Sequence, residues 1–539
     1  MTLGMDTNNL EQMDNKSPRT YRFWIPALII SAYIGLVFWA RASEHMMGAG
    51  LVFLGNILGV FLLWIWWTFL SGLRGWGKWV SLLSAVFVVG FLSTSIRYAG
   101  SSDGSGMPRF VWKWSPTPDQ RLLGALPQPN AANVPEAPLR YLAADSPEYY
   151  GPNRNGVFNN LSIQVGALGD SLEELWHQPI GMGWSSFAVV GRIAVTQEQR
   201  GGEEWVTAYA LESGSRLWHY AKTRRFSEAM GGDGPRATPS IHNNTVYALG
   251  ATGILDALNL TNGAPQWSFN VLASGDPNLM WGKSASPLFL EPENTVIVTG
   301  GAAQGPTVQA LHADTGEVVW SWGNEASSYA SPIEATIQGE RQLVVVNENT
   351  VVGLSPDAGK PLWVFDWPVG MMQPSAKVGQ PTVIDGSKVL ITASYGIGAV
   401  LFKLTRDNSG KLTPSQLWHS KNRLKTKFST ACVRGNYAYG LDEGIFACLN
   451  LTNGKRLWKD GRYGFGQNLL VDDTLLIQAE NGDIALVAAD PKAFRELARF
   501  PAIDGKTWNV PTLAGEYLLV RNDREAACYR LPVVANPTK

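Results

Sequence analysis

The sequence predicts an all-β protein, an eight-bladed β-propeller of four-stranded antiparallel blades with N-terminal strand closure, preceded by three transmembrane α-helices. The first observation is a phrase that occurs five times: a small residue, a Gly six positions later, and a Trp four positions after that. The second is the spacing of this phrase and its weaker copies, which return about every 40 to 55 residues, as propeller blades do. The third is that the first hundred residues contain three uncharged apolar runs.

The apolar runs come first in the chain. They cover Phe23–Ala40, Leu51–Leu70 and Trp79–Ile96, and each has about 18 to 20 residues, which is long enough to span a bilayer. Tryptophans stand near their ends, as in the aromatic belts of membrane proteins. A cleaved signal peptide is the alternative for the first run, but two more runs follow it closely and no small-residue cleavage site is evident. We therefore expect a membrane domain over residues 23–97.

Basic residues predict the orientation of this domain. They concentrate before the first run and between the second and the third, at Lys16, Arg19, Arg22, Arg74 and Lys78. The loop between the first two runs has only Arg41. Because cytoplasmic loops carry the excess of Lys and Arg, residues 1–22 are expected in the cytoplasm and the propeller on the other side of the membrane.

A segment of different composition follows the membrane domain. Residues 98–147 contain SSDGSGMP, SPTPD and ALPQPNAANVPEAP, a mixture of Pro, Ser, Ala and Asn without periodicity. Such a mixture is typical of a linker. The propeller is then expected over residues 148–535.

Each full copy of the phrase has the pattern of a β-hairpin. An apolar strand end is followed by a polar turn with Gly at its left-handed position, and then by a short strand that ends in Trp. The copies are AYALESGSRLW at 208–218, ALNLTNGAPQW at 257–267, ALHADTGEVVW at 310–320, GLSPDAGKPLW at 353–363 and CLNLTNGKRLW at 448–458.

Weaker copies complete the count of blades. Trp176, Trp418 and Leu497 keep the spacing, so that eight marks divide the chain into seven intervals. After Leu497 the chain supplies three more strands, in VPTLAG, YLLVRND and AACYRLP. The fourth strand of an eighth blade can be LEELWHQPI at 172–180, from the start of the array, which would close the ring and remove both exposed sheet edges.

The phrase resembles the tryptophan-docking motif of the quinoprotein alcohol dehydrogenase-like propellers, whose repeats are called PQQ-like and which include BamB-like assembly factors. The resemblance covers roughly residues 145–531, and EYYGPNRNGVF at 148–158 is similar to the lead-in of bacterial PQQ-like repeat proteins. It implies a protein of the bacterial inner (plasma) membrane with its propeller in the periplasm or another extracytoplasmic space. A fold does not fix a chemistry, so function has to be argued from a site.

Composition excludes several function classes. With 44 basic and 45 acidic residues the net charge is −1, which indicates neither a nucleic-acid surface nor an acidic partner domain. Cys432, Cys448 and Cys528 lie in strand runs and form no CxxC, so neither a disulfide framework nor a thiolate metal site is predicted. No histidine falls in the segments expected near the propeller axis, which argues against a His-based triad or zinc site.

The connections from the outermost strand of one blade to the innermost strand of the next are expected to meet at one mouth of the central channel. They are rich in Gly, with aromatic, amide and basic residues just before the inner strand. The ligand-binding candidates at this mouth are Trp184, Arg236, Lys283, Tyr329, Gln373, Lys427, Gln467, Lys506, Trp508 and Asn509. Glu228, Asp233 and Asp504 are the nearby carboxylates for acid–base chemistry or calcium. No catalytic residue and no metal ligand is assigned.

Two interpretations of the mouth remain open. In one, Gly and small polar residues are simply what a crowded channel admits, and charged residues are solvated at its rim. In the other, Arg236, Lys283 and Lys427 attract an anion, while Trp184 or Trp508 offers a stacking face. A planar, multiply anionic molecule such as PQQ would suit such a pocket.

Two function classes follow. The sequence favours a membrane-anchored extracytoplasmic scaffold that binds an envelope protein or a small anionic ligand without chemistry. The alternative resembles a membrane-bound quinoprotein dehydrogenase, in which PQQ with Ca²⁺ oxidises an alcohol or sugar and electrons pass to membrane quinone. The adjacent Cys pair of the alcohol-oxidising members is missing, although the membrane glucose-oxidising members also lack it. No CxxCH haem site occurs, and no Glu, Asn and Asp calcium set is recognisable by motif.

Overall fold

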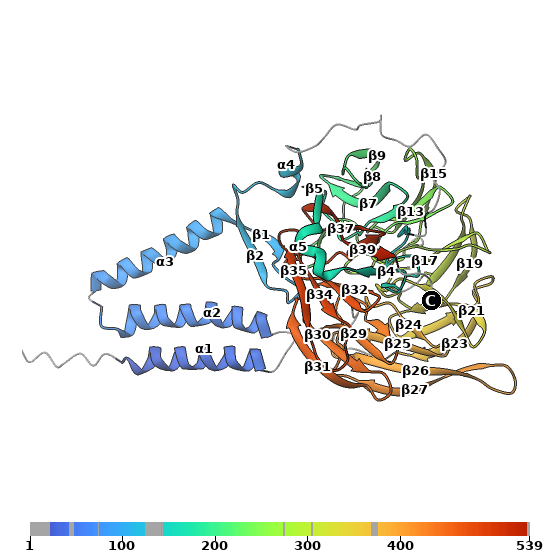
Figure 1. Ribbon diagram of the computed structural model, residues 1–539. Coiled ribbons are helices and arrows are strands. Elements are labelled where there is room, and N and C mark those ends of the chain that lie inside the picture. Colours follow the sequence, from blue (N-terminus) through green and yellow to red (C-terminus); the bar gives the residue numbers. More distant parts are fainter. Residues whose placement is uncertain are drawn as a thin grey trace, which may run out of the picture. The chain divides into compact units, whose positions relative to one another are not determined.

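The computed structural model describes residues 22–42, 48–73, 75–123, 142, 144–272, 275–302, 305–367 and 376–535. The chain, shown in Figure 1, divides into two compact units. The first comprises Met1–Ala99 and Ser105–Ser115, and the second comprises Gly100–Gly104 and Pro116–Lys539. The short segment Gly100–Gly104 therefore belongs with the propeller, although the residues on both sides of it belong to the first unit.

The first unit contains the apolar helices. They are α1 (Trp24–Ala42), α2 (Gly48–Ile65), which continues as the π-helical turn η1 (Trp66–Leu70), and α3 (Gly75–Ser95). Gly50–Leu70 and Gly75–Ser95 are long and apolar enough to cross a membrane, and Trp24–Ala40 is a shorter apolar helix. A Cβ on Gly55 of α2 would lie 2.6 Å from Cδ2 of Leu36 on α1, so this glycine allows the two helices to pack closely.

Short elements occur where the composition indicated only a linker. Strand β1 (Ile96–Ser101) pairs with β2 (Pro108–Trp112), and α4 (Pro118–Leu123) follows. A capping box starts α4, because the Thr117 hydroxyl accepts a bond from the Gln120 amide while the Gln120 side chain accepts one from the Thr117 amide, at 3.2 and 2.8 Å. The hairpin and the helix are too short to give a periodic signal in the sequence.

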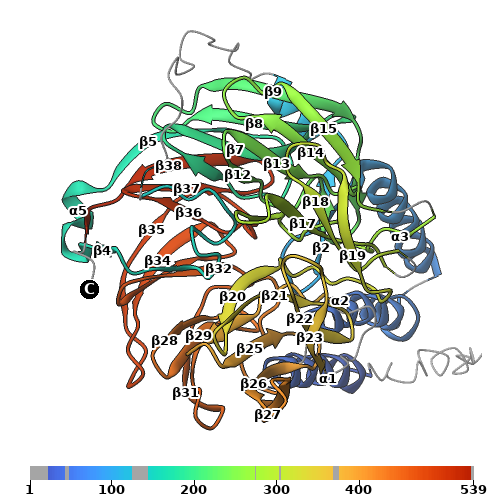
Figure 2. The same cartoon turned by 90° about the vertical axis from the view of Figure 1, so that its right-hand side faces the viewer.

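The second unit is the predicted eight-bladed propeller, whose antiparallel sheets follow one another around a ring (Figure 2). The first four blades comprise β6 (Ala188–Val190), β7 (Ile193–Arg200), β8 (Glu203–Ala210) and β9 (Arg216–Thr223); β12 (Ser240–His242), β13 (Thr245–Leu249), β14 (Ile254–Asn259) and β15 (Pro265–Asn270); β16 (Leu288–Leu290), β17 (Thr295–Thr299), β18 (Val308–His312) and β19 (Val318–Trp322); β20 (Ile333–Ile337), β21 (Glu340–Val346), β22 (Thr350–Leu354) and β23 (Pro361–Asp366).

The remaining blades continue in the same order. They comprise β24 (Thr382–Ile384), β25 (Lys388–Ala393), β26 (Gly398–Arg406) and β27 (Leu412–Ser420); β28 (Cys432–Arg434), β29 (Tyr437–Asp442), β30 (Ile445–Asn450) and β31 (Lys455–Arg462); β32 (Gln467–Val471), β33 (Thr474–Gln478), β34 (Asp483–Ala488) and β35 (Glu496–Pro501); and β36 (Thr512–Ala514), β37 (Tyr517–Arg521) and β38 (Glu525–Arg530), with β5 as the fourth strand. A two-stranded ribbon of β10 (Ser227–Glu228) and β11 (Gly232–Asp233) interrupts the connection between the first two blades.

The ring closes as the sequence predicted. Strand β5 (Glu173–Pro179) pairs antiparallel with β38 and completes the last blade, with Trp176 opposite Cys528. Before β5 the chain forms two short strands, β3 (Val157–Phe158), which pairs with β32, and β4 (Leu161–Ile163), which pairs with β39 (Val533–Ala535). Between β4 and β5 lie the helical turns η3 (Val165–Ala167) and α5 (Leu168–Ser171).

The docking phrase links neighbouring blades. The indole N–H of Trp218 donates to the carbonyl of Leu260 in the next blade at 2.7 Å, and its ring covers Gly263, where a Cβ would lie 2.5 Å from Cε3. The same two contacts recur for Trp176, Trp267, Trp320 and Trp418, with N···O distances of 2.7 to 3.0 Å. The glycines of the phrase therefore do more than permit their turns, since they also make room for the tryptophan of the preceding blade.

The small residue of the phrase is fixed by its own tryptophan. In each full copy it lies directly opposite that Trp across the strand pair, as Ala257 does with Trp267 and Gly353 with Trp363. At Gly353 a Cβ would lie 2.1 Å from Nε1 of Trp363. Trp363 also differs from the others, since its indole donates to Oε1 of Gln342 within its own blade. The next blade carries only the weak copy of the phrase, which lacks the glycine.

This packing predicts a difference between two glycine substitutions in one blade. Gly359 and Gly339 both have positive φ, +64° and +76°, but a Cβ on Gly359 would lie 2.4 Å from Cε3 of Trp320, whereas one on Gly339 meets nothing within 4 Å. Gly359→Ala should lower the free energy of unfolding by about 1 to 3 kcal/mol more than Gly339→Ala does. Both substitutions strain a backbone with positive φ, but only the first overpacks the interface between blades. Thermal unfolding of the purified variants measures this difference, and equal losses would contradict the docking account.

Candidate functional site

Two sets of loops converge at one end of the central channel. One set is the connections between blades, which the sequence predicted there, and the other is turns within blades. The connections between blades carry Trp508, between β35 and β36, and Phe465, between β31 and β32. Glu480, in the turn between β33 and β34, accepts bonds from the Trp508 indole at 2.7 Å and from the Phe465 amide at 3.1 Å. We call this end of the channel the mouth.

Aromatic rings and a lysine form one side of the mouth. The rings of Trp184 and Trp508 lie 4.7 Å apart between centroids, and the ring of Phe428 also lies 4.7 Å from that of Trp508. Nζ of Lys506 stands 4.2 Å from the centroid of Trp508 and 5.1 Å from that of Trp184. Three of the predicted residues, Trp184, Lys506 and Trp508, are thus brought together from the first and last connections.

Lys427 lies beside this group. Its Nζ is 4.5 Å from the centroid of Phe465 and 5.6 Å from that of Phe428, so aromatic faces hold the ammonium in place. Burial lowers the pKa of Lys427, while the charges of Glu443, Glu480 and Asp103 act to raise it. The two acidic residues Glu443 and Glu480 come from turns within blades, and Asp103 comes from the segment Gly100–Gly104.

The segment Gly100–Gly104 occupies the mouth. Nζ of Lys506 donates to the Ser101 carbonyl at 3.0 Å, and the Ser101 hydroxyl donates to the Met230 carbonyl at 2.8 Å. The Gly104 amide donates to Oε1 of Glu480 at 2.5 Å, and Nζ of Lys427 donates to the Gly104 carbonyl. Ser101 and Gly104 are both buried. The groups that were expected to attract a planar anion are therefore bonded to polypeptide main chain.

Arg236 lies on the connection between the first and second blades, and Tyr329 lies on that between the third and fourth. The Arg236 guanidinium donates to the carbonyls of Gly232 and Gly234 in its own loop, the first at 2.8 Å, and stacks 4.5 Å from the Phe226 centroid. Burial lowers the pKa of Arg236 to about 10. The Tyr329 hydroxyl accepts a bond from the Trp281 amide at 3.3 Å. Arg236 therefore folds the long connection back on itself.

The side chain of Lys283 is wholly buried. Its Nζ donates to the Gly300 carbonyl, to Thr299 Oγ1 at 3.1 Å and to Ser327 Oγ at 3.4 Å. Burial lowers the pKa of Lys283 to about 7. Lys377, which holds the equivalent position two connections later, is buried in the same way and donates to the Glu348 carbonyl.

The two amides tie connections together. Nε2 of Gln467 donates to the carbonyls of Phe428 and Trp508, both at 2.8 Å, and its Oε1 accepts from the Tyr150 hydroxyl at 3.1 Å. Nδ2 of Asn509 donates to the Ser185 carbonyl at 2.8 Å. Both side chains are buried. Gln373 lies outside the described residues.

The carboxylates proposed for calcium do not come together. Glu228 accepts bonds from the amides of Met230 and Gly231, and Asp233 accepts from Arg225 at 2.5 Å and from Ser227 at 2.6 Å. Asp504 belongs to the connection between β35 and β36, where its amide donates to Glu525 at 2.5 Å. Within the ranges that the structure describes, no group of three or more His, Cys, Asp or Glu side chains is arranged to hold a metal ion. These carboxylates do not fit a calcium–PQQ centre.

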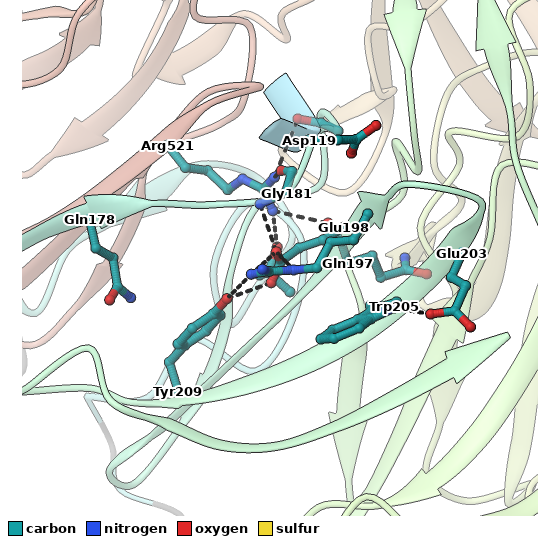
Figure 3. Close-up of polar contacts among 12 residues, drawn as sticks. Asp119, Gln178, Gly181, Gln197, Glu198, Glu203, Trp205, Tyr209 and Arg521 are labelled. Carbon is teal, nitrogen blue, oxygen red and sulfur yellow. Dashed lines mark hydrogen bonds and ion pairs between the residues drawn. The ribbon is translucent and has the colours of Figure 1, made fainter. Parts of the chain in front are cut away.

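A buried ionic cluster that the sequence did not reveal joins the first and last blades (Figure 3). The Glu198 carboxylate accepts from the Tyr209 hydroxyl at 2.6 Å, the Gly181 amide at 2.7 Å and Nε of Arg200 at 2.9 Å. Arg521 donates to the Gly181 carbonyl at 2.9 Å. Burial acts to raise the pKa of Glu198, but the charges of Arg200 and Arg521 outweigh it and hold that pKa below its ordinary value. The cluster fastens the closed ring.

Other contributors to the mouth were also missed. Glu480 lies in a turn within a blade, and the sequence-based prediction took candidates only from the connections between blades. Tyr395, in the turn between β25 and β26, was missed for the same reason, and its ring centroid lies 5.4 Å from Nζ of Lys427. Residues 101–104 gave no signal, because their contacts with Glu480 span 376 positions of the chain.

The repeats, the closure and the inter-blade tryptophans define a PQQ-like β-propeller. Residues 169–300 and 251–495 match the family described as outer membrane protein assembly factor BamB. The chain belongs to this family. None of the curated proteins matches the sequence.

Solved structures include two kinds of relative. BamB from Moraxella catarrhalis is 16% identical with a TM-score of 0.48, and the match covers 67% of this chain and 97% of that one. Quinohemoprotein alcohol dehydrogenase from Comamonas testosteroni is 13% identical with a TM-score of 0.54, and the match covers 78% of this chain and 85% of that one. At 13% identity the likeness to the dehydrogenase concerns the fold alone.

Lys283 predicts a pH dependence of stability. Its pKa of about 7 in the folded chain lies below the ordinary value of 10.5, so between these values the unfolded chain binds more protons. The free energy of unfolding should therefore rise as the pH increases from about 7 to 10.5. Below about pH 7 the folded protein bears the full cost of burying the ammonium. Lys283→Met should reduce this rise, and Lys360→Met, at an exposed lysine, should leave it unchanged. Denaturation midpoints from about pH 6 to about pH 10 test this, and equal slopes in all three proteins would contradict it.

Proposed function

We propose that this protein is a membrane-anchored scaffold whose propeller lies outside the cytoplasm and binds a protein partner at the mouth. The observation that carries the proposal is the bonding of Lys427, Lys506 and Glu480 to the main chain of Ser101 and Gly104. Groups placed to pair with amides and carbonyls recognise peptide. No bond is made or broken in this function.

The apolar helices support the anchoring. Leu54 of α2 and Phe87 of α3 are 60% and 72% exposed in a chain whose propeller buries its large apolar side chains between blades. Helices with such surfaces are stable in the hydrocarbon of a bilayer. The basic residues before α1 and between α2 and α3 favour the cytoplasmic side for those segments, which places the propeller on the opposite side.

Two methionines support a protein partner. Met230 and Met280 lie on connections at the mouth and are 52% and 58% exposed. Methionine is flexible and polarizable, and it is common on surfaces that adapt to other proteins. Together with the tryptophans nearby, these side chains give the mouth the aromatic and methionine content that is enriched in interfaces.

The dehydrogenase alternative has no comparable support. Glu228 and Asp233 are bonded to their own loop and to Arg225, and Lys283 is wholly buried and bonded to the Gly300 carbonyl. A PQQ site needs cations and a metal-binding set on one face of a pocket. The residues named for that role are dispersed.

One pair of cysteine variants tests location and binding together. The three native cysteines are buried, so Met280→Cys at the mouth and Ser409→Cys at the exposed turn between β26 and β27 would be the reactive thiols. Both should react in intact cells with a maleimide that cannot cross the inner membrane. With a benzophenone maleimide, Met280→Cys should crosslink to a defined protein and Ser409→Cys should not.

The same crosslink separates the alternatives. Adding Trp508→Ala should remove it, because this ring supports Lys506 and bonds to Glu480. Labelling of both cysteines only after permeabilisation would contradict the location, and equal crosslinking at both would contradict the mouth as the site. Saturable binding of PQQ with calcium, accompanied by reduction of an artificial electron acceptor, would favour the dehydrogenase.

A further inference from the structure

The mouth holds Gly100–Gly104 much as a receptor holds a peptide. Both bonded carbonyls, those of Ser101 and Gly104, face a lysine ammonium, and the bonded Gly104 amide faces the Glu480 carboxylate. Charge-assisted bonds of this kind are shorter and stronger than neutral ones. These bonds involve only main-chain atoms, and residues 102–105 lie in the bends and turn between β1 and β2, so a peptide that adopts the same turn can make them.

Shape restricts which segment fits. A Cβ on Gly104 would lie 2.4 Å from Cδ2 and 2.6 Å from Cγ of Phe465, so this position admits glycine. Gly104 does not have a positive φ, and the requirement is therefore steric and not conformational. Three residues earlier, the buried Ser101 hydroxyl donates to the Met230 carbonyl and lies 3.3 Å from Nζ of Lys506. This position favours a small hydroxyl side chain.

Charge restricts the segment further. Asp103 acts electrostatically on Lys427, whose ammonium it favours, and on Glu480, whose ionised form it opposes. Lys427 and Lys506 both rest on aromatic faces, at 4.5 Å from Phe465 and 4.2 Å from Trp508. Aromatic faces therefore help to hold both cations, and an acidic residue beside the glycine complements the charge of Lys427.

We propose that the mouth is a recognition site for a turn-forming acidic peptide of the form Ser-x-Asp-Gly, and that Gly100–Gly104 is its tethered resident, which a partner peptide of the same chemistry displaces. The inference rests on the proposed binding function and specifies its ligand. A tethered segment has an effective concentration on the order of millimolar, so the resident weakens the apparent affinity for a free peptide without changing the site.

The test frees the site in the full-length protein. Gly104→Val places a branched side chain against Phe465 and should expel the resident, whereas Ser102→Val, at an exposed position of the same segment, should not. A fluorescent peptide with the sequence of residues 100–106, GSSDGSG, is titrated against each protein in detergent by anisotropy. Gly104→Val should bind it at least about tenfold more tightly than the wild type or Ser102→Val.

Two further measurements make the result decisive. Lys427→Ala added to Gly104→Val should abolish the gain, and the peptide GSSDVSG should not bind. Hydrogen exchange should show residues 100–104 released in Gly104→Val, while thermal unfolding reports whether the propeller remains folded. Release without tighter peptide binding, equal binding of GSSDVSG, or no release at all would overturn the proposal. None of these outcomes decides whether Met280→Cys crosslinks to a partner, so the proposed function is tested independently of this inference.

Discussion

The docking of each tryptophan on the next blade is the interaction on which the rest of the structure depends. An indole such as that of Trp218 packs on Gly263 and bonds to the Leu260 carbonyl, so the phrase fixes both a hairpin and the distance to its neighbour. Repetition of this contact determines how the blades are set around the axis. Closure through β5 and the Glu198–Arg521 cluster removes the remaining free edges. The connections then have one place to meet, which is the mouth.

Crowding at the mouth decides what its charges do. The predicted cations have different sets of partners: Arg236 bonds to its own loop, Lys283 bonds to Thr299 and Gly300, and Lys427 and Lys506 bond to the main chain of Gly100–Gly104. Burying a charge costs free energy unless the charge is paired or hydrogen-bonded, and each of these contacts offsets that cost. Only Lys427 and Lys506 bond to a segment that a ligand could replace.

The sequence predicted the propeller because its signals are local. Ala257, Gly263 and Trp267 lie within one hairpin, and their spacing alone encodes the fold, the blade count and the need for closure. The partners at the mouth are not local. Lys283 and Lys427 occupy equivalent positions in their connections and both are buried, yet Lys283 bonds to Gly300, 17 positions away, and Lys427 bonds to Gly104, 323 positions away. Glu198 lies within β7 and Arg521 at the end of β37, and only the assembled ring brings them together.

Amide hydrogen exchange at Gly104 in the full-length wild-type protein tests the central claim most directly. If the mouth binds the main chain of this segment, the Gly104 amide, held by Glu480, should exchange at least about tenfold more slowly than an unstructured chain would. Exchange of Gly104 at the unstructured rate, with the strands of the propeller fully protected, would contradict the account.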